Sequence, residues 1–175
     1  MSSTTYQIEK PVRSDFDEWS KLFHDYIAFY NSKIEEDQYI KTFDRIIEGK
    51  NGLQALVVRQ VRDNEKTMVG IAHFFPEQTP WSEKQILLLN GKHMYSRNAM
   101  TVSWREHSDN LDLFIDPSVR GAGLGRKLTQ AVADVGKEMG CFRLQWVTKH
   151  DNTTARKLYD TLGESQFIQY RMNLQ

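Results

Sequence analysis

The amino-acid sequence predicts a single domain of the α/β (α+β) class, in which helices cover both faces of a mixed, mostly antiparallel sheet. Three observations support this class: two helical apolar patterns near the N-terminus, two β-rich runs joined by a polar turn, and an alternation of strand and helix after residue 110. A chain of 175 residues can bury a core without covalent staples. We expect one domain over residues 1–175, preceded by a disordered tail of residues 1–5.

The composition limits the binding partners. Lysine plus arginine (23) equals aspartate plus glutamate (23), so no overall charge attracts nucleic acid or a membrane surface. The single cysteine, Cys141, excludes an intramolecular disulfide, and its place between a helix and a strand favours a small packed side chain over a nucleophile. No apolar run approaches the roughly 18 residues of a membrane span. We therefore expect a cytoplasmic or nuclear protein with no metal site.

The N-terminal half reads as one strand, two helices and a hairpin. Residues 6–12 alternate like a strand, and Ser14 or Asp15 can cap the helix that follows. That helix carries a stripe of large side chains, and such a stripe is typical of a core: Phe16, Trp19, Leu22, Phe23, Tyr26 and Tyr30. Residues 39–49 form a second helical pattern, and the acidic run before it is either a solvated loop or a rim that attracts cations. Residues 53–61 and 67–75 form the hairpin, with His73 as a packed core residue.

Residues 82–110 interrupt this order and are predicted to be an insertion. Residues 86–89 could begin a strand, but the stretch after Gly91 has weak periodicity and no clear turns. Loops of this length are usually functional or disordered. Two explanations stay open: a lid over an acceptor site, or an accident of gene modelling such as an unspliced segment.

The chain is organised around a glycine-rich loop between a strand and a helix. The strand covers residues 111–115, the Asp116-Pro117 turn follows, and the helix runs from Leu124 until Gly140 ends it. Glycines at 121, 123 and 125 leave backbone N–H groups uncovered at the positive end of the helix, which makes a ready anion site. A dinucleotide fingerprint fails at Arg126, and the Gly-Lys-Ser/Thr of a P-loop is missing. A further strand (residues 141–148), a short helix (153–162) and a last strand (167–172) complete the pattern.

Two spaced motifs carry a family resemblance. The loop reads R-x-x-G-x-G, with Arg120, Gly123 and Gly125, and the short helix reads N-x-x-A-x-x-L-Y-x-x-x-G, with Asn152 and Tyr159 at its two ends. Together they resemble the GNAT superfamily of N-acetyltransferases. The first helix, W-x-x-L-x-x-x-Y-x-x-F-Y, resembles that of a fungal subgroup of D-amino-acid, polyamine and histone acetyltransferases. In those relatives about ten residues lead from the hairpin to the central strand, so residues 82–110 are nearly three times as long.

The resemblance implies acetyl-coenzyme A (acetyl-CoA) as cosubstrate, with no metal. It implies a central strand splayed from its neighbour, whose amides at Leu113, Phe114 and Ile115 pair with the pantetheine arm and polarise the thioester carbonyl. One face of the short helix, with Asn152, Ala155 and Tyr159, is expected to look at the coenzyme. The loop is expected to hold the pyrophosphate with Arg120, Gly121, Ala122, Gly123, Leu124, Gly125 and Arg126.

Two residues are candidates for acid–base chemistry. By the resemblance, the Tyr159 hydroxyl protonates the leaving thiolate, and a phenol of pKa about 10 suits a thiol of about 8.5. Asp112 is the candidate base, because an ammonium of pKa about 10.4 must lose its proton before it attacks. A core tyrosine and a salt-bridged carboxylate are the alternatives, with His150 or Asp151 as weaker bases. The acceptor side is predicted to hold Tyr26, Tyr30, Trp81 and Asp112.

The sequence therefore predicts an N-acetyltransferase in which a primary amine attacks the thioester directly in a ternary complex. The acceptor is a small molecule, such as a polyamine or an amino acid, or a protein lysine. The alternative is a non-catalytic acetyl-CoA-binding sensor or interaction domain. A homodimer is a further prediction.

Overall fold

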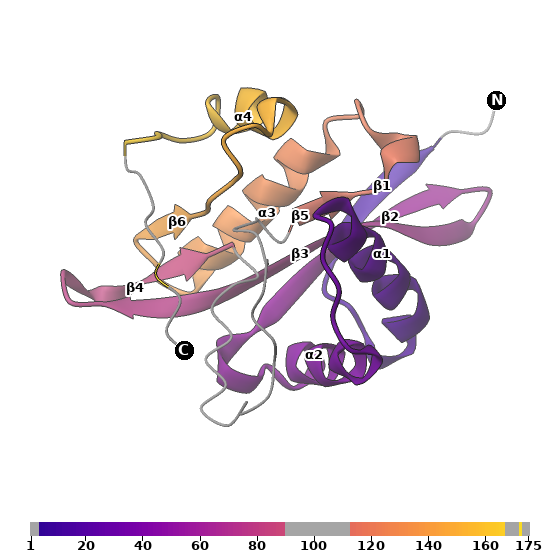
Figure 1. Cartoon of the computed structure of the whole chain (residues 1–175), viewed down its shortest axis with the longest axis horizontal. Helices are drawn as coiled ribbons and strands as arrows, with labels where there is room; N and C mark the ends of the chain where they lie inside the picture. Colours follow the sequence, from indigo (N-terminus) through magenta and orange to yellow (C-terminus); the bar gives the residue numbers. More distant parts are fainter. Residues whose placement is uncertain (1–3, 90–112, 167–171, 173–175) are drawn as a thin grey trace.

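The computed structural model describes residues 4–89, 113–166 and 172, and the fold is given for these residues (Figure 1). Its helices are α1 (Phe16–Phe29), α2 (Glu36–Glu48), α3 (Leu124–Glu138) and α4 (Thr153–Tyr159), with short 3-10 turns at Arg13–Asp15, Lys50–Gly52 and Pro117–Val119. Its strands are β1 (Thr5–Glu9), β2 (Gln54–Arg62), β3 (Glu65–Thr79), β4 (Ser82–Leu88), β5 (Leu113–Ile115) and β6 (Arg143–Gln145).

The strands form one mixed sheet in the order β1-β2-β3-β4-β6, with β5 also paired to β3. All pairings are antiparallel except that of β4 with β6, which is parallel. The long strand β3 is central, because β2 lies along one of its edges while β4 and β5 pair with different parts of its length. This confirms the predicted fold class.

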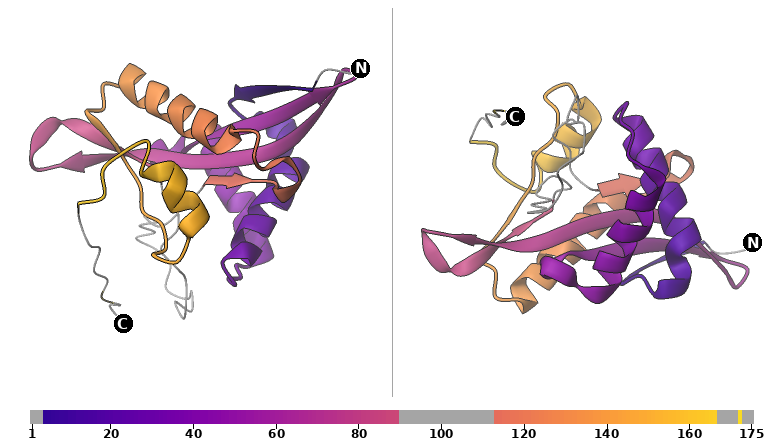
Figure 2. Two further views of the ribbon diagram at one scale, coloured as in Figure 1. Left: turned by 90° about the horizontal axis from the view of Figure 1, so that it is seen from above. Right: turned by 60° about the horizontal axis from the view of Figure 1, so that its bottom comes forward.

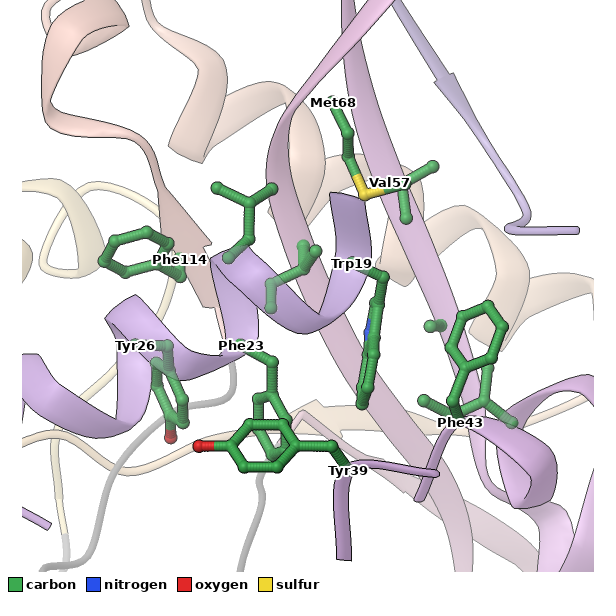
Figure 3. Close-up of a cluster of buried hydrophobic side chains, with 12 residues drawn as sticks. Trp19, Phe23, Tyr26, Tyr39, Phe43, Val57, Met68 and Phe114 are labelled. Atoms are coloured by element: carbon green, nitrogen blue, oxygen red, sulfur yellow. The ribbon is translucent and has the colours of Figure 1, made fainter. Parts of the chain in front are cut away.

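Helices cover both faces of the sheet, and each face has its own core (Figure 2). Helices α1 and α2 pack over Val57, Ile71 and Phe114, and helix α3 packs over Val58, Ala72 and Ile115 on the other face. Neighbouring residues of one strand thus belong to different cores, which is the period-two alternation of a sheet buried on both sides. Figure 3 shows the aromatic side chains of the first core, in which Trp19, Phe23, Tyr26 and Phe114 are labelled.

The predicted core histidine has a specific partner. His73 is 2% exposed, and its Nε2 accepts a hydrogen bond of 2.9 Å from the indole Nε1 of Trp19. The ring of Phe23 stands edge-on to it at 5.2 Å. The contact joins α1 to the middle of β3, so this histidine helps to fix the first helix on the sheet.

Several element ends differ from the predictions for local physical reasons. Strand β1 begins at Thr5 and ends at Glu9, so Thr5 does not belong to the predicted tail, and the segment around Pro11 leads into a 3-10 turn. The acidic run is not a loop: Glu35 stands at the N-cap position of α2, and Glu36 and Asp37 form its first turn, where negative charge stabilises a helix. The predicted insertion is narrower than residues 82–110, since Ser82–Leu88 form β4. The predicted last strand lies almost wholly outside the described residues. No described helix is long and apolar enough to cross a membrane.

Candidate active site

Strand β5 presents one backbone edge that no described strand covers. The amide of Asp116 donates to the carbonyl of Val69 at 2.9 Å, and Ile71 lies opposite Phe114. Because backbone groups alternate along an antiparallel ladder, those of Phe114 face β3 while those of Leu113 and Ile115 face away from it. On that side β6 pairs only with β4, and residues 146–149 beyond it are not in a strand. The sheet therefore opens between β5 and the chain after β6.

The glycine-rich loop leads from this opening to the start of α3. Asp116 accepts hydrogen bonds from the amide (2.8 Å) and hydroxyl (2.6 Å) of Ser118, and these bonds lower the pKa of its carboxyl. Gly121 and Gly123 have φ of +85° and +73°, in the left-handed region that favours glycine, and a Cβ on either would have no neighbour within 4 Å. The loop is thus an open cradle of backbone beside a helix N-terminus, which suits an anion.

Helix α4 closes the other side of the loop. Its N-cap Asn152 accepts from the amide of Ala155 at 3.2 Å and donates to Thr148 at 3.3 Å. A Cβ built on Gly125 would lie 3.2 Å from a methyl group of Leu158, so glycine at this position lets α4 approach α3. The side chain of Arg126 donates to the hydroxyl of Thr161 at 2.7 Å, which fastens the end of α4 to the first turn of α3.

Tyr159 ends α4 in an enclosed position. Its ring stands edge-on to Trp146 with 5.7 Å between centroids, and it packs against the core under α3. Gly163 leaves room for that indole, because a Cβ there would lie 3.1 Å from it. Burial, with a smaller contribution from the nearby Tyr30, raises the pKa of Tyr159 above that of a free tyrosine. The hydroxyl therefore stays protonated through neutral pH and can act only as a proton donor there.

The end of α1 faces the same region with an aromatic wall. Tyr26 is edge-on to Tyr30 at 5.2 Å and to Phe114 at 6.4 Å, which joins α1 to β5. Two cations lie on this wall: the Nζ of Lys149 is 5.2 Å from the ring centre of Tyr30, and the guanidinium of Arg120 is 5.9 Å from that of Phe114. Arg120 also donates from Nε to the carbonyl of Ile115 at 3.2 Å.

The structure brings most of the predicted residues together but not all. Tyr26 contacts Tyr30 and Phe114, and Gly125 of the loop lies against Leu158 of α4. Trp81 does not join them: it lies in the turn between β3 and β4, at the far tip of that hairpin, and is 91% exposed. Asp112 lies outside the described residues. The side chains of Arg120 and Arg126 each donate a hydrogen bond within the chain, to the carbonyl of Ile115 and to the hydroxyl of Thr161.

Two residues of this region were not predicted as site residues. Trp146 was predicted only as a strand residue, and Lys149 carried no prediction. Both follow β6, where the chain leaves the sheet and turns toward α4. A large aromatic near the end of a predicted strand and a lysine just after that strand would have been the signal, but their partners Tyr159 and Tyr30 are visible only in the folded chain.

Comparison with known proteins agrees with this geometry. The family described as Acetyltransferase (GNAT) matches residues 19–163. The D-amino-acid N-acetyltransferase of Saccharomyces cerevisiae is 24% identical over 160 residues, which cover 91% of this chain and 85% of that protein.

Solved structures share the fold at lower identity. The crystal structure of a probable acetyltransferase has a TM-score of 0.72 at 20% identity, covering 97% of this chain and 98% of that one. The aminoglycoside acetyltransferase AAC(6')-Iy, in complex with the bisubstrate analogue CoA-S-monomethyl-acetylneamine, has a TM-score of 0.66 at 17% identity, covering 97% and 99%. Since the family match spans most of the chain, the protein belongs to the GNAT family of acetyltransferases and is an N-acetyltransferase.

Proposed function

We propose that the chain transfers the acetyl group of acetyl-CoA to the primary amine of a small molecule, by direct attack in a ternary complex. The observation that carries the proposal is the position of Tyr159: it is partly buried beside Trp146, next to the acceptor-side Tyr30, on a helix that packs against the glycine-rich loop. Two similar proteins support these substrate classes. AAC(6')-Iy was solved with a bisubstrate analogue that contains coenzyme A, and the yeast relative is a D-amino-acid N-acetyltransferase.

The residues present fit the coenzyme. The open backbone of Gly121 and Gly123, at the start of α3, offers N–H groups to a pyrophosphate. The uncovered edge of β5 at Leu113 and Ile115 offers extended backbone to the pantetheine arm and to the thioester carbonyl. The side chain of Asn152 caps α4, and this bond holds it in a fixed orientation. The side chain predicted to contact the pantetheine is therefore already oriented.

The proposed reaction needs one proton donor at the leaving sulfur. The amine nitrogen bonds to the carbonyl carbon, the carbon–sulfur bond breaks, and the Tyr159 hydroxyl gives its proton to the thiolate. The proton that the nitrogen releases as it becomes an amide returns to the tyrosinate. The raised pKa keeps the Tyr159 hydroxyl protonated at neutral pH, so the proton is available for transfer. Cys141 is at the junction of α3 and β6, and burial raises the pKa of its thiol, so it is unsuited to form an acyl-enzyme.

The amine must first lose its own proton, which costs about 4 to 5 kcal/mol at pH 7 for a pKa near 10.4. Asp112 stays the sequence-based prediction for this base, one residue before β5 in the chain. The aromatic wall of Tyr26 and Tyr30 is the proposed contact surface for the acceptor.

Replacing Tyr159 by phenylalanine tests the proposal. The ring and its packing on Trp146 remain and only the hydroxyl is lost, so kcat should fall by about 10²-fold or more while coenzyme affinity changes little. Thermal unfolding should stay near that of the wild type. Tyr6→Phe is the matched control, since Tyr6 lies in β1 and its hydroxyl only accepts from Gln60. Equal losses in kcat, affinity and stability would assign Tyr159 a structural role.

A panel of acceptors tests the activity itself. Acetyl-CoA consumption should be measured with polyamines, D- and L-amino acids, aminoglycosides and histone peptides. We expect turnover with a small-molecule amine. Binding of acetyl-CoA without turnover on any acceptor would instead favour a sensor or interaction domain.

A further inference from the structure

Strands β4 and β5 share one alignment on β3 although 24 residues (89–112) separate them. Leu88 lies opposite Phe75, and Leu113 lies opposite Ala72, both in antiparallel register. Only Phe74 and His73 of β3 lie between these two pairs. A continuous strand would fill those positions with two residues, so the chain carries 22 residues more than the register needs.

Both strands lie on the same edge of β3. The amide of Leu89 donates to Gln145 and that of Phe142 to Gln85, so odd-numbered residues of β4 bond to β6 and even-numbered ones face β3. Leu88 and Phe114 therefore turn their backbone toward Phe75 and Ile71, which have the same parity on β3. Strand β3 is continuous through these residues, and its pairs are in regular register from Gly70 to Ala72 and again from Phe75 to Glu77, so one β3 edge serves both strands.

Side-chain alternation gives an independent check. Leu87 and Leu89 are fully buried in the core under α3, as Ile115 is, whereas Phe114 belongs to the core under α1 and α2. If Leu89 were followed directly by residue 112, the residues 87, 89, 113 and 115 would all fall on the α3 face and 114 on the other. Removing one residue more or fewer would break this alternation.

We infer that β4 and β5 are the two halves of a single central strand, and that residues 90–111 interrupt it. The domain is complete without those 22 residues, and a chain that joins Leu89 to Asp112 forms one uninterrupted strand opposite Glu77 to Gly70 of β3. This inference rests on the register and the two cores, and it holds whether or not the proposed reaction is correct.

A deletion series tests the inference on the otherwise full chain. The variant that lacks residues 90–111 should fold and unfold cooperatively. Its Tm should be at least that of the parent and up to about 5 °C higher, because the loop to be closed becomes far shorter. Hydrogen exchange should show the amides of Ile86, Leu88 and Phe114, which face β3, protected as one unit together with that of His73, which lies between their partners on β3.

The matched control removes one residue too many. Joining Leu89 to Leu113, by deleting residues 90–112, forces β5 to slip by one residue and turns Phe114 toward the wrong core. This variant should lose at least 5 °C in Tm or fail to fold. The inference would be overturned if the 22-residue deletion unfolded at as low a temperature as this control, or if its exchange pattern showed two separately protected strands.

Discussion

Gly70 allows three strands to meet, and adding one methyl group there is a sharp test of how β5 is placed. Gly70 lies between Val58 of β2 and Ile115 of β5. A Cβ at this position would be 2.6 Å from the Cδ1 of Ile115, 3.1 Å from a methyl of Val58 and 3.2 Å from the carbonyl oxygen of Phe114. Carbon atoms pack at about 3.5 to 4.0 Å, so the nearest contact is too short by about 1 Å.

Gly70→Ala should therefore destabilise the fold by about 1 to 3 kcal/mol, the usual cost of overpacking. Ile115→Val removes the Cδ1 atom itself and should cost about 0.5 to 1.5 kcal/mol alone. In the double variant the worst overlap is gone, so its loss should be smaller than the sum of the two by about 1 kcal/mol. The remaining contacts with Val58 and Phe114 limit the rescue.

Urea unfolding followed by tryptophan fluorescence measures all four corners of this cycle. Gly140→Ala is the matched control: Gly140 has φ of +75° and open space around its Cβ, so its cost of about 1 kcal/mol is conformational and should add to that of Ile115→Val. Additivity within about 0.5 kcal/mol for Gly70→Ala with Ile115→Val would show that β5 does not lie against Gly70 as described.

Two further predictions concern charged groups away from the proposed chemistry. Asp15 and Arg59 form an ion pair at 2.6 Å with both side chains 9% exposed, so Asp15→Ala should lower the free energy of unfolding in urea by about 3 kcal/mol. Asp44 pairs with Arg13 at the surface, so Asp44→Ala should lower it by less than about 1 kcal/mol. Equal losses would contradict the difference in burial. Hydrogen bonds from Ser118 lower the pKa of Asp116, so its stabilisation is complete above the unfolded pKa near 3.9 and is lost as pH falls through the lower folded pKa. Asp116→Asn should accordingly flatten the fall of Tm below about pH 4, and an unchanged acid slope would exclude this group as a source.

Local patterns predicted the elements of the fold well, because helix stripes, glycine stops and turn residues act over a few positions. The aromatic stripe of α1, the hairpin of β2 and β3 and the helix between Gly123 and Gly140 all lie where periodicity indicates them. Boundaries were less accurate where charge or pairing decides them. The start of α2 is set by acidic residues that favour a helix N-terminus, and the length of β6 is set by its partner β4.

In the candidate site, too, the local motifs could be predicted from the sequence but the contacts between distant segments could not. Spacing alone identified the loop around Gly123 and the helix that ends at Tyr159, since each motif lies within one short segment. It could not reveal that Trp146 packs on Tyr159, or that Lys149 lies over Tyr30, because these partners come from different elements. For Trp81 the structure gives only its place, exposed in the turn between β3 and β4, and its contact with the acceptor stays a prediction.

The sequence by itself determined the family, the class of fold and the position of the loop, since all three are written in local spacing and in motifs of a few residues. Only the tertiary structure decided three things: which edge of β5 stays uncovered, which groups of the chain Arg120 and Arg126 bind, and how β4 and β5 are aligned on β3. Strand register is a relation between distant segments. A gap of 24 residues in the chain can correspond to two positions on a neighbouring strand, and no local pattern records that correspondence.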